Sequence, residues 1–364
     1  MKKIIIVSLL LFLFQHCFGV SSGTFTVNQW GTGNYTTLAS AESGLQGVLI
    51  STCYIVITGS WTVADGVTTF AGWTTFSTAP VIVQTTGLSR HSGIWNENAY
   101  KIRSNLPYGI GFIVNIKHIY IDGLQIDLQD GDPSANDCGI YELYNGSNDQ
   151  YRNFSNNYIR YSGSTTVNYN NRTGMALDYG KRGIYKIWNN ILQDFYTGML
   201  VVYCTTGSTY YIYNNTIKAS QSDIGMSLSA QYSATQSYLF LYLKNNLVQG
   251  TTFQGYVFQT INYGIRCTSA CNISSDATSP NTDYGNLTVS FLNGATNWLL
   301  LSSTDTVAID KARDLSADSG LSFNTDIIGT IRPSGVAWDI GANEYIYPTV
   351  SATKRRIRRP IVLE

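Results

Sequence analysis

Residues 185–192, 210–217 and 241–248 read YKIWNNIL, YYIYNNTI and LYLKNNLV. Each stretch is rich in aliphatic and aromatic residues up to an Asn-Asn pair, and it becomes apolar again soon after the pair. Such runs, bounded by turn residues, indicate β-strands, and Asn tolerates the left-handed conformation that a tight turn needs. The three stretches therefore predict three copies of one strand–turn–strand unit.

Two further stretches fit the same frame. Residues 154–159 read FSNNYI, and residues 119–126 read IYIDGLQI, with Asp122-Gly123 in place of the Asn pair. The second residues of the pairs then lie at positions 123, 157, 190, 215 and 246, at intervals of 34, 33, 25 and 31 residues. A second mark recurs in phase with the pairs, because alternating strands begin at Gly139, Gly174, Gly198, Gly225 and Gly255. Two marks in phase indicate an internal repeat.

The repeat predicts an all-β fold, a right-handed parallel β-helix (a solenoid) with a short N-terminal capping helix over residues 35–43. A single coil cannot bury its apolar face, but a stack of coils buries a continuous core. The Asn side chains would form a hydrogen-bonded ladder, and the varying interval predicts insertions at one corner, where binding usually occurs. Helical periodicity is absent elsewhere, a propeller would need longer and more regular units, and a β-sandwich would lack an Asn pair in phase.

The repeat and the C-terminal residues resemble the pectate-lyase-like right-handed parallel β-helix proteins of the exported bacterial type. Ala308-Ile-Asp310, Arg332-Pro333-Ser-Gly335 and Asp339-Ile-Gly-Ala-Asn-Glu344-Tyr345 are similar to the closing segment of that family, which ends in a DIGAxEY-like motif. With this resemblance we expect four regions: a signal peptide (1–19), an N-terminal cap with the first coils (20–104), the β-helix with its closing segment (105–347) and a flexible basic tail (348–364).

The N-terminus has the features of a secretory signal peptide. Lys2 and Lys3 precede an apolar run of eleven residues, 4–14, which is too short for a membrane span of about 20 residues, and cleavage is expected after Gly19. The alternative is a buried N-terminal strand. No later apolar run approaches about 18 residues, so we expect a secreted or cell-surface protein without a transmembrane segment.

The charge is low and unevenly distributed. Charged residues make up 13% of the chain, about half of the usual ~25%, and 23 basic residues balance 23 acidic ones. Seven basic residues and Glu364 lie at the termini, so the body between them has sixteen basic and twenty-two acidic residues, a net charge of −6. This balance argues against nucleic-acid binding, and it means that a polyanionic glycan would need Ca²⁺ or a local basic patch to bind.

Cysteines and aromatic residues each leave two interpretations open. Cleavage after Gly19 leaves five cysteines, an odd number, so at least one thiol stays free or pairs between molecules. Cys267 and Cys271 could close a small loop, or both could be buried apolar residues. The 26 Tyr and 7 Trp residues could serve as sugar platforms or stack along the wall of the β-helix. Trp61, Trp73 and Trp95 are expected to pack against the first coils.

Charged residues at one corner of the repeat form the candidate catalytic site. Aligning the Gly-marked strands places Asp178, Val202, Ser229 and Gln259 at one outward position, and Glu142 takes that position one coil earlier. Rungs about 4.8 Å apart would bring the two carboxylates together, where they could hold a cation or exchange protons. The family resemblance implies a uronate lyase, in which Glu142 and Asp178 hold Ca²⁺ and Lys181 or Arg182 removes the C5 proton. The alternatives are a solvated loop, and a one-residue shift of the frame that turns Glu142 inward.

An acidic loop over residues 127–137 is a candidate Ca²⁺ site, with Asp130, Asp132 and Asp137 as metal ligands. Hard cations prefer clustered carboxylate and amide oxygens. The loop is not an EF-hand, because position 12 counted from Asp130 is Tyr141 rather than Glu. The alternative is a solvated acidic turn.

The sequence thus supports two functions. The first is an exported protein that binds or degrades an extracellular polysaccharide or cell-surface glycan, with Ca²⁺-assisted β-elimination of a uronate-containing glycan as its chemistry. The second is a non-catalytic surface or fibre protein that uses the β-helix for adhesion. The pectate lyase Asp-His signature is missing, since Gly123 follows Asp122. Fold alone does not choose between the two functions, and the sequence leaves the oligomeric state open.

Overall fold

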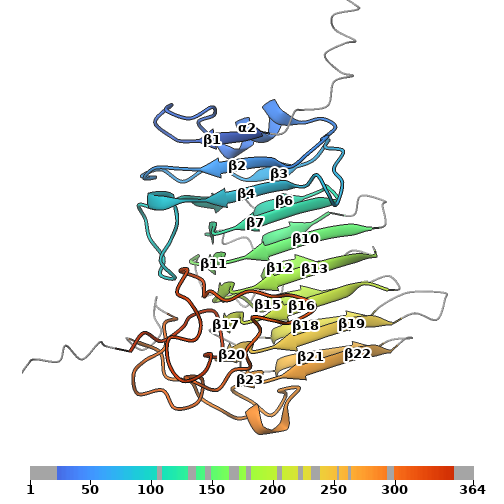
Figure 1. The fold of residues 1–364 in the computed structure, drawn as a ribbon, viewed down its shortest axis with the longest axis vertical. Coiled ribbons are helices and arrows are strands. Elements are labelled where there is room, and N and C mark those ends of the chain that lie inside the picture. Colours follow the sequence, from blue (N-terminus) through green and yellow to red (C-terminus); the bar gives the residue numbers. More distant parts are fainter. Residues whose placement is uncertain are drawn as a thin grey trace, which may run out of the picture.

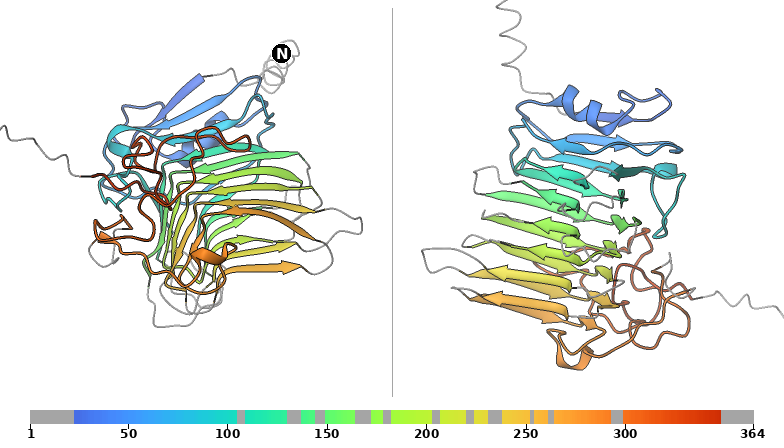
Figure 2. Two further views of the ribbon diagram at one scale, coloured as in Figure 1. Left: turned by 60° about the horizontal axis from the view of Figure 1, so that its bottom comes forward. Right: turned by 180° about the vertical axis from the view of Figure 1, so that it is seen from behind.

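The protein is a stack of coils. A computed structural model describes residues 23–104, 109–129, 137–143, 149–163, 172–177, 182–202, 207–219, 224–230, 238–251, 254–260, 264–292 and 299–347. Short strands lie side by side along the stack (Figure 1), and all paired strands are parallel. The fold is therefore the predicted parallel β-helix, and two further views show the same stack (Figure 2).

Three parallel sheets form the walls of the stack. Sheet 1 has nine strands: β1 (Gly23–Val27), β2 (Cys53–Ile57), β4 (Val81–Thr85), β7 (His118–Asp122), β10 (Gln150–Ser155), β13 (Gly183–Trp188), β16 (Thr209–Tyr213), β19 (Leu239–Lys244) and β22 (Ile265–Ala270). Sheet 2 has seven: β5 (Lys101–Ser104), β8 (Gln125–Leu128), β11 (Tyr158–Tyr161), β14 (Ile191–Gln193), β17 (Thr216–Lys218), β20 (Leu247–Gln249) and β23 (Ile273–Ser274). Sheet 3 also has seven: β3 (Thr68–Phe70), β6 (Ile110–Val114), β9 (Cys138–Glu142), β12 (Thr173–Leu177), β15 (Thr197–Val201), β18 (Ile224–Ala230) and β21 (Gln254–Thr260). Each full coil runs through sheet 3, then sheet 1, then sheet 2.

The interior of the stack is a continuous apolar core. One register row of sheet 1 contains Ile121, Phe154, Ile187, Ile212 and Leu243, and all five side chains are fully buried. Burying one such side chain contributes about 1.5–3 kcal/mol, so the stacking of like residues in rows accounts for much of the stability. Trp61 and Trp73 are buried against the first coils, as predicted.

The Asn pairs form the corner between sheet 1 and sheet 2. The first Asn of each pair has a left-handed backbone, with φ between 50° and 56° at Asn156, Asn189, Asn214 and Asn245. The second Asn is fully buried. Its backbone N–H and its side-chain amide both donate to the Oδ1 of the corresponding Asn in the next coil, at 2.9–3.1 Å, from Asn157 through Asn190, Asn215 and Asn246 to Asn272. The predicted Asn ladder is confirmed.

The strand register corrects the alignment of one coil. Asp122 pairs with Ser155, so Gly123 lies beside the first Asn of the next coil and not beside the second. Gly123 has a φ of 78° and supplies the left-handed residue of that turn. The copy at residues 271–272 was not recognised in the sequence, because Cys271 replaces the first Asn; its φ is 53°.

Sheet 3 is built on a ladder of glycines. A methyl group on Gly198 would lie 2.7 Å from the carbonyl oxygen of Gly225 and 2.4 Å from the Ile217 side chain. The equivalent approach recurs at Gly139 and Gly174. The glycines that mark the repeat in the sequence therefore occupy positions where any side chain would clash with the next coil.

The N-terminal end of the stack is closed. Helix α2 (Leu38–Leu45) lies across it (Figure 1) and begins three residues later than predicted. Thr37 caps this helix, because its hydroxyl accepts the Ser40 N–H at 3.1 Å and its own N–H donates to the Ser40 hydroxyl. The free edge of β1 is also occupied: the Tyr35 N–H donates to the Thr26 carbonyl at 3.0 Å.

The closing segment, residues 299–347, lies along the corner between sheets 1 and 2 (Figure 1). The amides of the first Asn residues reach its main chain: Asn189 donates to the Thr325 carbonyl, Asn214 to those of Asp339 and Gly341, and Asn245 to that of Arg313. The segment therefore binds three successive coils through the same turn position.

The described cysteines are free thiols. Cys53, Cys138, Cys267 and Cys271 form no disulfide, so the loop that Cys267 and Cys271 could have closed is not made. Cys267 is exposed in β22, and Cys271 lies in the next turn. Within the ranges given above, no helix has the length and apolarity that a membrane crossing requires.

Candidate binding pocket on sheet 1

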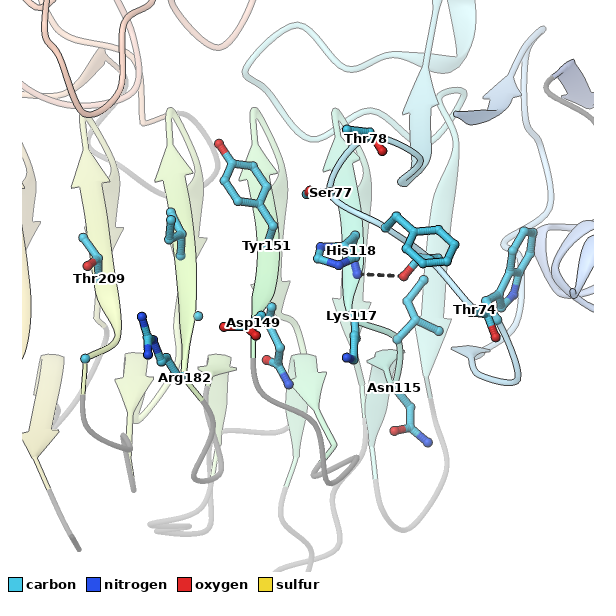
Figure 3. Close-up of a pocket in the computed structure, with 18 residues that line it drawn as sticks. Thr74, Ser77, Thr78, Asn115, Lys117, His118, Asp149, Tyr151, Arg182 and Thr209 are labelled. Carbon is cyan, nitrogen blue, oxygen red and sulfur yellow. Dashed lines mark hydrogen bonds between the residues drawn. The ribbon is translucent and has the colours of Figure 1, made fainter. Parts of the chain in front are cut away.

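A pocket of about 930 Å³ lies where the strands of sheet 1 begin (Figure 3). It is lined by the loop 73–78, by residues 115–118 leading into β7, by 149–151 and 182–184 at the starts of β10 and β13, and by Gly207 and Thr209 at β16. We call it the sheet 1 pocket. Because successive rungs are about 4.8 Å apart, the pocket extends about 14 Å from β7 to β16 along the stack.

The loop 73–78 forms one wall and is held in place from both sides. The buried carboxylate of Glu42 in α2 accepts the Trp73 indole N–H and the Ala71 N–H, each at 3.0 Å. On the other side, the Thr75 hydroxyl accepts the His118 backbone N–H at 3.0 Å. The loop is therefore fixed to the cap and to sheet 1, while Phe76 keeps 49% of its surface exposed.

Three charged side chains from successive coils lie along the pocket. Figure 3 shows Asp149 between Lys117 and Arg182. Asp149 adopts a φ of 65°, and its backbone N–H donates to the Arg182 carbonyl at 2.9 Å, which fixes the two residues side by side. The Arg182 side chain passes over Gly207, where an added methyl group would lie 3.7 Å from Nε.

His118 lies on the floor of the pocket and is 93% buried. Burial, and next the cations of Lys117 and Arg152, lower its pKa to about 4. The imidazole is therefore neutral at physiological pH. Its Nδ1 is buried without a hydrogen-bond partner among the described residues, as is the Oδ1 of Asn115, another residue that lines the pocket.

Glu142 is not in the pocket, which corrects the predicted outward position. Tyr141 pairs with Ala176 and Val114 pairs with Glu142, so Glu142 lies one residue out of the predicted frame and faces the interior. It is 1% exposed and forms an ion pair with Arg152. The Tyr185 hydroxyl donates to its Oε1 at 3.1 Å. Glu142 therefore belongs to a buried polar cluster.

That cluster lies directly beneath the pocket. Arg152 donates through Nη2 to the carbonyl of Ile116 at 2.7 Å, and Tyr185 also contacts the Gln150 side chain at 2.7 Å. Ile116 and Gln150 both line the pocket. The ion pair of Arg152 and Glu142 therefore supports the floor of the pocket from inside the β-helix, and neither residue lines the pocket itself.

Of the other predicted site residues, Arg182 lines the pocket, whereas Asp178 and Lys181 lie outside the described residues. Asp130 and Asp132 lie outside them too. Asp137 is 2% exposed, and its Oδ1 accepts the Gly109 N–H at 2.8 Å, so it has a structural role at the start of β9. The described ranges contain no group of three or more His, Cys, Asp or Glu side chains placed to hold a metal ion.

Sequence reasoning missed Lys117, His118, Asp149 and Tyr151. All four lie at the junction between sheet 3 and sheet 1, directly before or at the start of a sheet 1 strand. The signal was the repeat itself, because the residues that precede each Asn pair by about six positions face one corner. The candidate search had instead followed the ends of the sheet 3 strands.

Comparison with known proteins adds little to this picture. No family model matches the chain, and no curated protein matches it. The crystal structure of pectate lyase Pel9A is similar, with 13% sequence identity, a TM-score of 0.33, and coverage of 90% of this chain and 97% of that chain. At this identity and score the similarity carries no argument about activity, so the function rests on the pocket.

Proposed function

We propose that this protein is exported and binds an acidic extracellular polysaccharide in the sheet 1 pocket. The observation that carries the proposal is a group of cations that form no ion pair with any described residue, on a chain whose body is acidic. Lys117 and Arg182 line the pocket, Lys186 lies in the next outward row of sheet 1, and the ion pairs of the described residues include none of the three. Cations that do form ion pairs within the described part of the chain include Arg90, Lys101, Arg103, Arg152, Arg160, Lys244 and Arg332.

The uncharged lining also suits a glycan. Hydroxyl groups of Thr74, Ser77, Thr78 and Thr209 face the pocket region, and such groups can exchange hydrogen bonds with sugar hydroxyls. Lys186 lies 5.6 Å from the ring centre of Tyr151 and 6.0 Å from that of Tyr211. Aromatic rings beside a cation offer both an apolar face and a charge. A polysaccharide that lies along the stack would therefore contact several coils of the protein in turn.

Binding without cleavage is the form that the geometry favours. Glu142 is withdrawn into the interior, and among the described residues that line the pocket Asp149 is the one carboxylate. Ca²⁺-assisted β-elimination, with Lys181 or Arg182 taking the C5 proton and the 4-linked sugar leaving, stays a prediction, as does Ca²⁺ bound by the acidic loop. The alternative of a non-catalytic adhesion protein is compatible with binding at the same pocket.

Affinity electrophoresis through gels containing polygalacturonate, alginate or a neutral β-glucan tests the proposal. The wild type should be retarded by an acidic glycan, and the double variant Lys117→Ala/Arg182→Ala should bind at least tenfold more weakly. Lys311→Ala/Arg313→Ala, which removes the same two charges from exposed sites on the closing segment, is the matched control and should bind as the wild type does. Equal retardation of both variants would contradict the proposal.

The same glycans, incubated with and without Ca²⁺, test cleavage. Elimination forms an unsaturated product whose ultraviolet absorbance increases with time. A product that disappears in Arg182→Ala would restore the lyase prediction. Retardation without any product would establish binding alone.

A further inference from the structure

The two ends of the stack differ. The N-terminal end is closed by α2 and by the residues that occupy the edge of β1. At the other end, β22 and β21 are the terminal strands of sheets 1 and 3, and no described strand pairs with their outer edges. In β21 the Gly255 and Tyr256 N–H groups donate to the Asp276 and Thr278 side chains, so β22 has the more open edge. Core positions are open to solvent here: Phe258, which continues the buried row of Leu228, is 38% exposed, and Cys267, which continues the row of Leu241, is exposed.

The free main-chain groups of β22 can be identified from the ladder. The Asn245 N–H donates to the Ala270 carbonyl at 2.9 Å, so Ala270 directs its main-chain groups toward β19. Main-chain direction alternates along a strand, and Ser269, Cys267 and Ile265 therefore direct their N–H and C=O groups to the open edge. Unpaired edges of this kind are templates for another strand.

A second copy of this chain fits this edge for three reasons. Another coil of the same chain covers the exposed core positions with a matching row, and the closed N-terminal end excludes a head-to-tail contact. Two C-terminal ends related by a two-fold axis remain, which gives a closed dimer. Sheet 2 extends one rung beyond β23, because the Leu287 N–H donates to the Ser274 carbonyl at 3.0 Å, whereas sheet 3 ends at β21. The two-fold axis therefore places sheet 2 of one copy, which is longer by one rung, opposite sheet 3 of the other copy, which is shorter.

We propose that the protein forms an end-to-end dimer in which β22 pairs antiparallel with β22 of a second copy. The side chains that face the core must lie on the same side of both strands. Cys267 therefore lies opposite Cys267 of the second copy, and Ile265 lies opposite Ser269. Arg266 then faces Thr268, and no like charges are opposed. The pairing supplies about six main-chain hydrogen bonds, two for each of three hydrogen-bonded pairs. The dimer doubles the length of the stack and places two sheet 1 pockets on one particle.

Sedimentation equilibrium of the full chain over a range of concentrations tests the dimer. We expect twice the chain mass, and we expect Cys267→Pro to weaken association at least tenfold, because proline removes a free edge N–H yet is tolerated on edge strands. Cys267→Asp should do the same by opposing two carboxylates, and it keeps the test valid if the proline variant fails to fold. Thr268→Ser, which alters the neighbouring outward side chain, should leave the dimer unchanged.

Cross-linking tests the register. A short bismaleimide should join two chains of the wild type and of Cys271→Ser, whereas Cys267→Ser should remain a dimer by sedimentation but lose the cross-link. A monomer at all concentrations overturns the proposal, as does a dimer that neither Cys267→Pro nor Cys267→Asp weakens. Either result leaves glycan binding at the pocket untouched, because β22 contributes no residue to it.

Discussion

Arg152 and Glu142 form an ion pair inside the β-helix, with side chains that are 0% and 1% exposed. Removing one member of such a pair leaves a buried charge without a partner, which costs about 3–5 kcal/mol. We therefore expect Glu142→Leu to lower the free energy of unfolding by about that amount in urea denaturation. The double variant Glu142→Leu/Arg152→Met should recover most of the loss, because apolar residues of similar volume replace the pair. A double variant as unstable as the single one would contradict this account.

The Asn ladder should be sensitive at each rung. Asn215 receives two hydrogen bonds from Asn190 and donates through its amide to Ile187, Tyr213 and Asn246. Asn215→Ala leaves several buried groups unpaired, each at a cost of about 1–3 kcal/mol, so a total loss of about 3 kcal/mol or more is expected in chemical denaturation. Asn324→Ala, at an exposed position of the closing segment, is the control and should change stability little.

The same substitution, Gly to Ala, should have opposite effects inside and outside the glycine ladder of sheet 3. Gly198→Ala places a methyl group 2.4 Å from Ile217 and 2.7 Å from the Gly225 carbonyl, and overpacking of this kind costs about 1–3 kcal/mol. Gly66→Ala meets no atom within 4 Å and should be neutral or slightly stabilising. Thermal unfolding of the two variants measures the difference, and equal melting temperatures would disprove the steric explanation.

Both described histidines should titrate far below their usual range. Burial, followed by nearby cations, lowers the pKa of His91 and of His118 to about 4. In that case the unfolded chain binds more protons than the folded one between pH 4 and pH 6.5, so the histidine contribution to stability falls as the pH falls through this window. The full effect is roughly 3 kcal/mol per histidine at pH 4.

NMR titration of the imidazole signals measures the two pKa values directly. Denaturation of His118→Gln and of the wild type at matched pH values isolates the stability effect, because other groups act in both proteins. Asp339 is one such group, because burial raises its pKa to about 7. Its contribution to the free energy of unfolding therefore decreases as the pH rises, which is opposite to the effect of the histidines. A difference between the two proteins that stays constant from pH 4 to pH 6.5 would contradict the lowered pKa of His118.

The sequence predicted the β-helix because its two marks reflect two packing requirements. The Asn pair supplies the left-handed turn and the amide ladder at once, and the glycines permit the close approach of sheet 3 strands. Both requirements recur from coil to coil through the middle of the stack, so both appear as periodic residues. The turn at Cys271 escaped notice because the first Asn of the pair is replaced there. That position needs only a left-handed backbone, whereas the amide ladder runs through the second residue of each pair.

The site was less predictable because it depends on register. A shift of one residue between β9 and β12 turned Glu142 from an expected metal ligand into part of the interior. The charge of Lys117 and Arg182 was visible in the sequence. That neither forms an ion pair with a described residue depends on which side chains meet across coils 30 or more residues apart. Only the folded chain defines those neighbours.

The closing segment also alters how the protein should unfold. A plain stack has contacts between adjacent coils alone, so it can unravel from an end one unit at a time. The hydrogen bonds from Asn189, Asn214 and Asn245 to residues 313–341 cross-link three coils to one late part of the chain, and they span 68 to 136 residues of sequence. Such high contact order slows folding, and the same contacts must break together before the middle coils can separate. The Asn corner therefore converts a modular array into one cooperative unit whose completion waits for its last fifty or so residues.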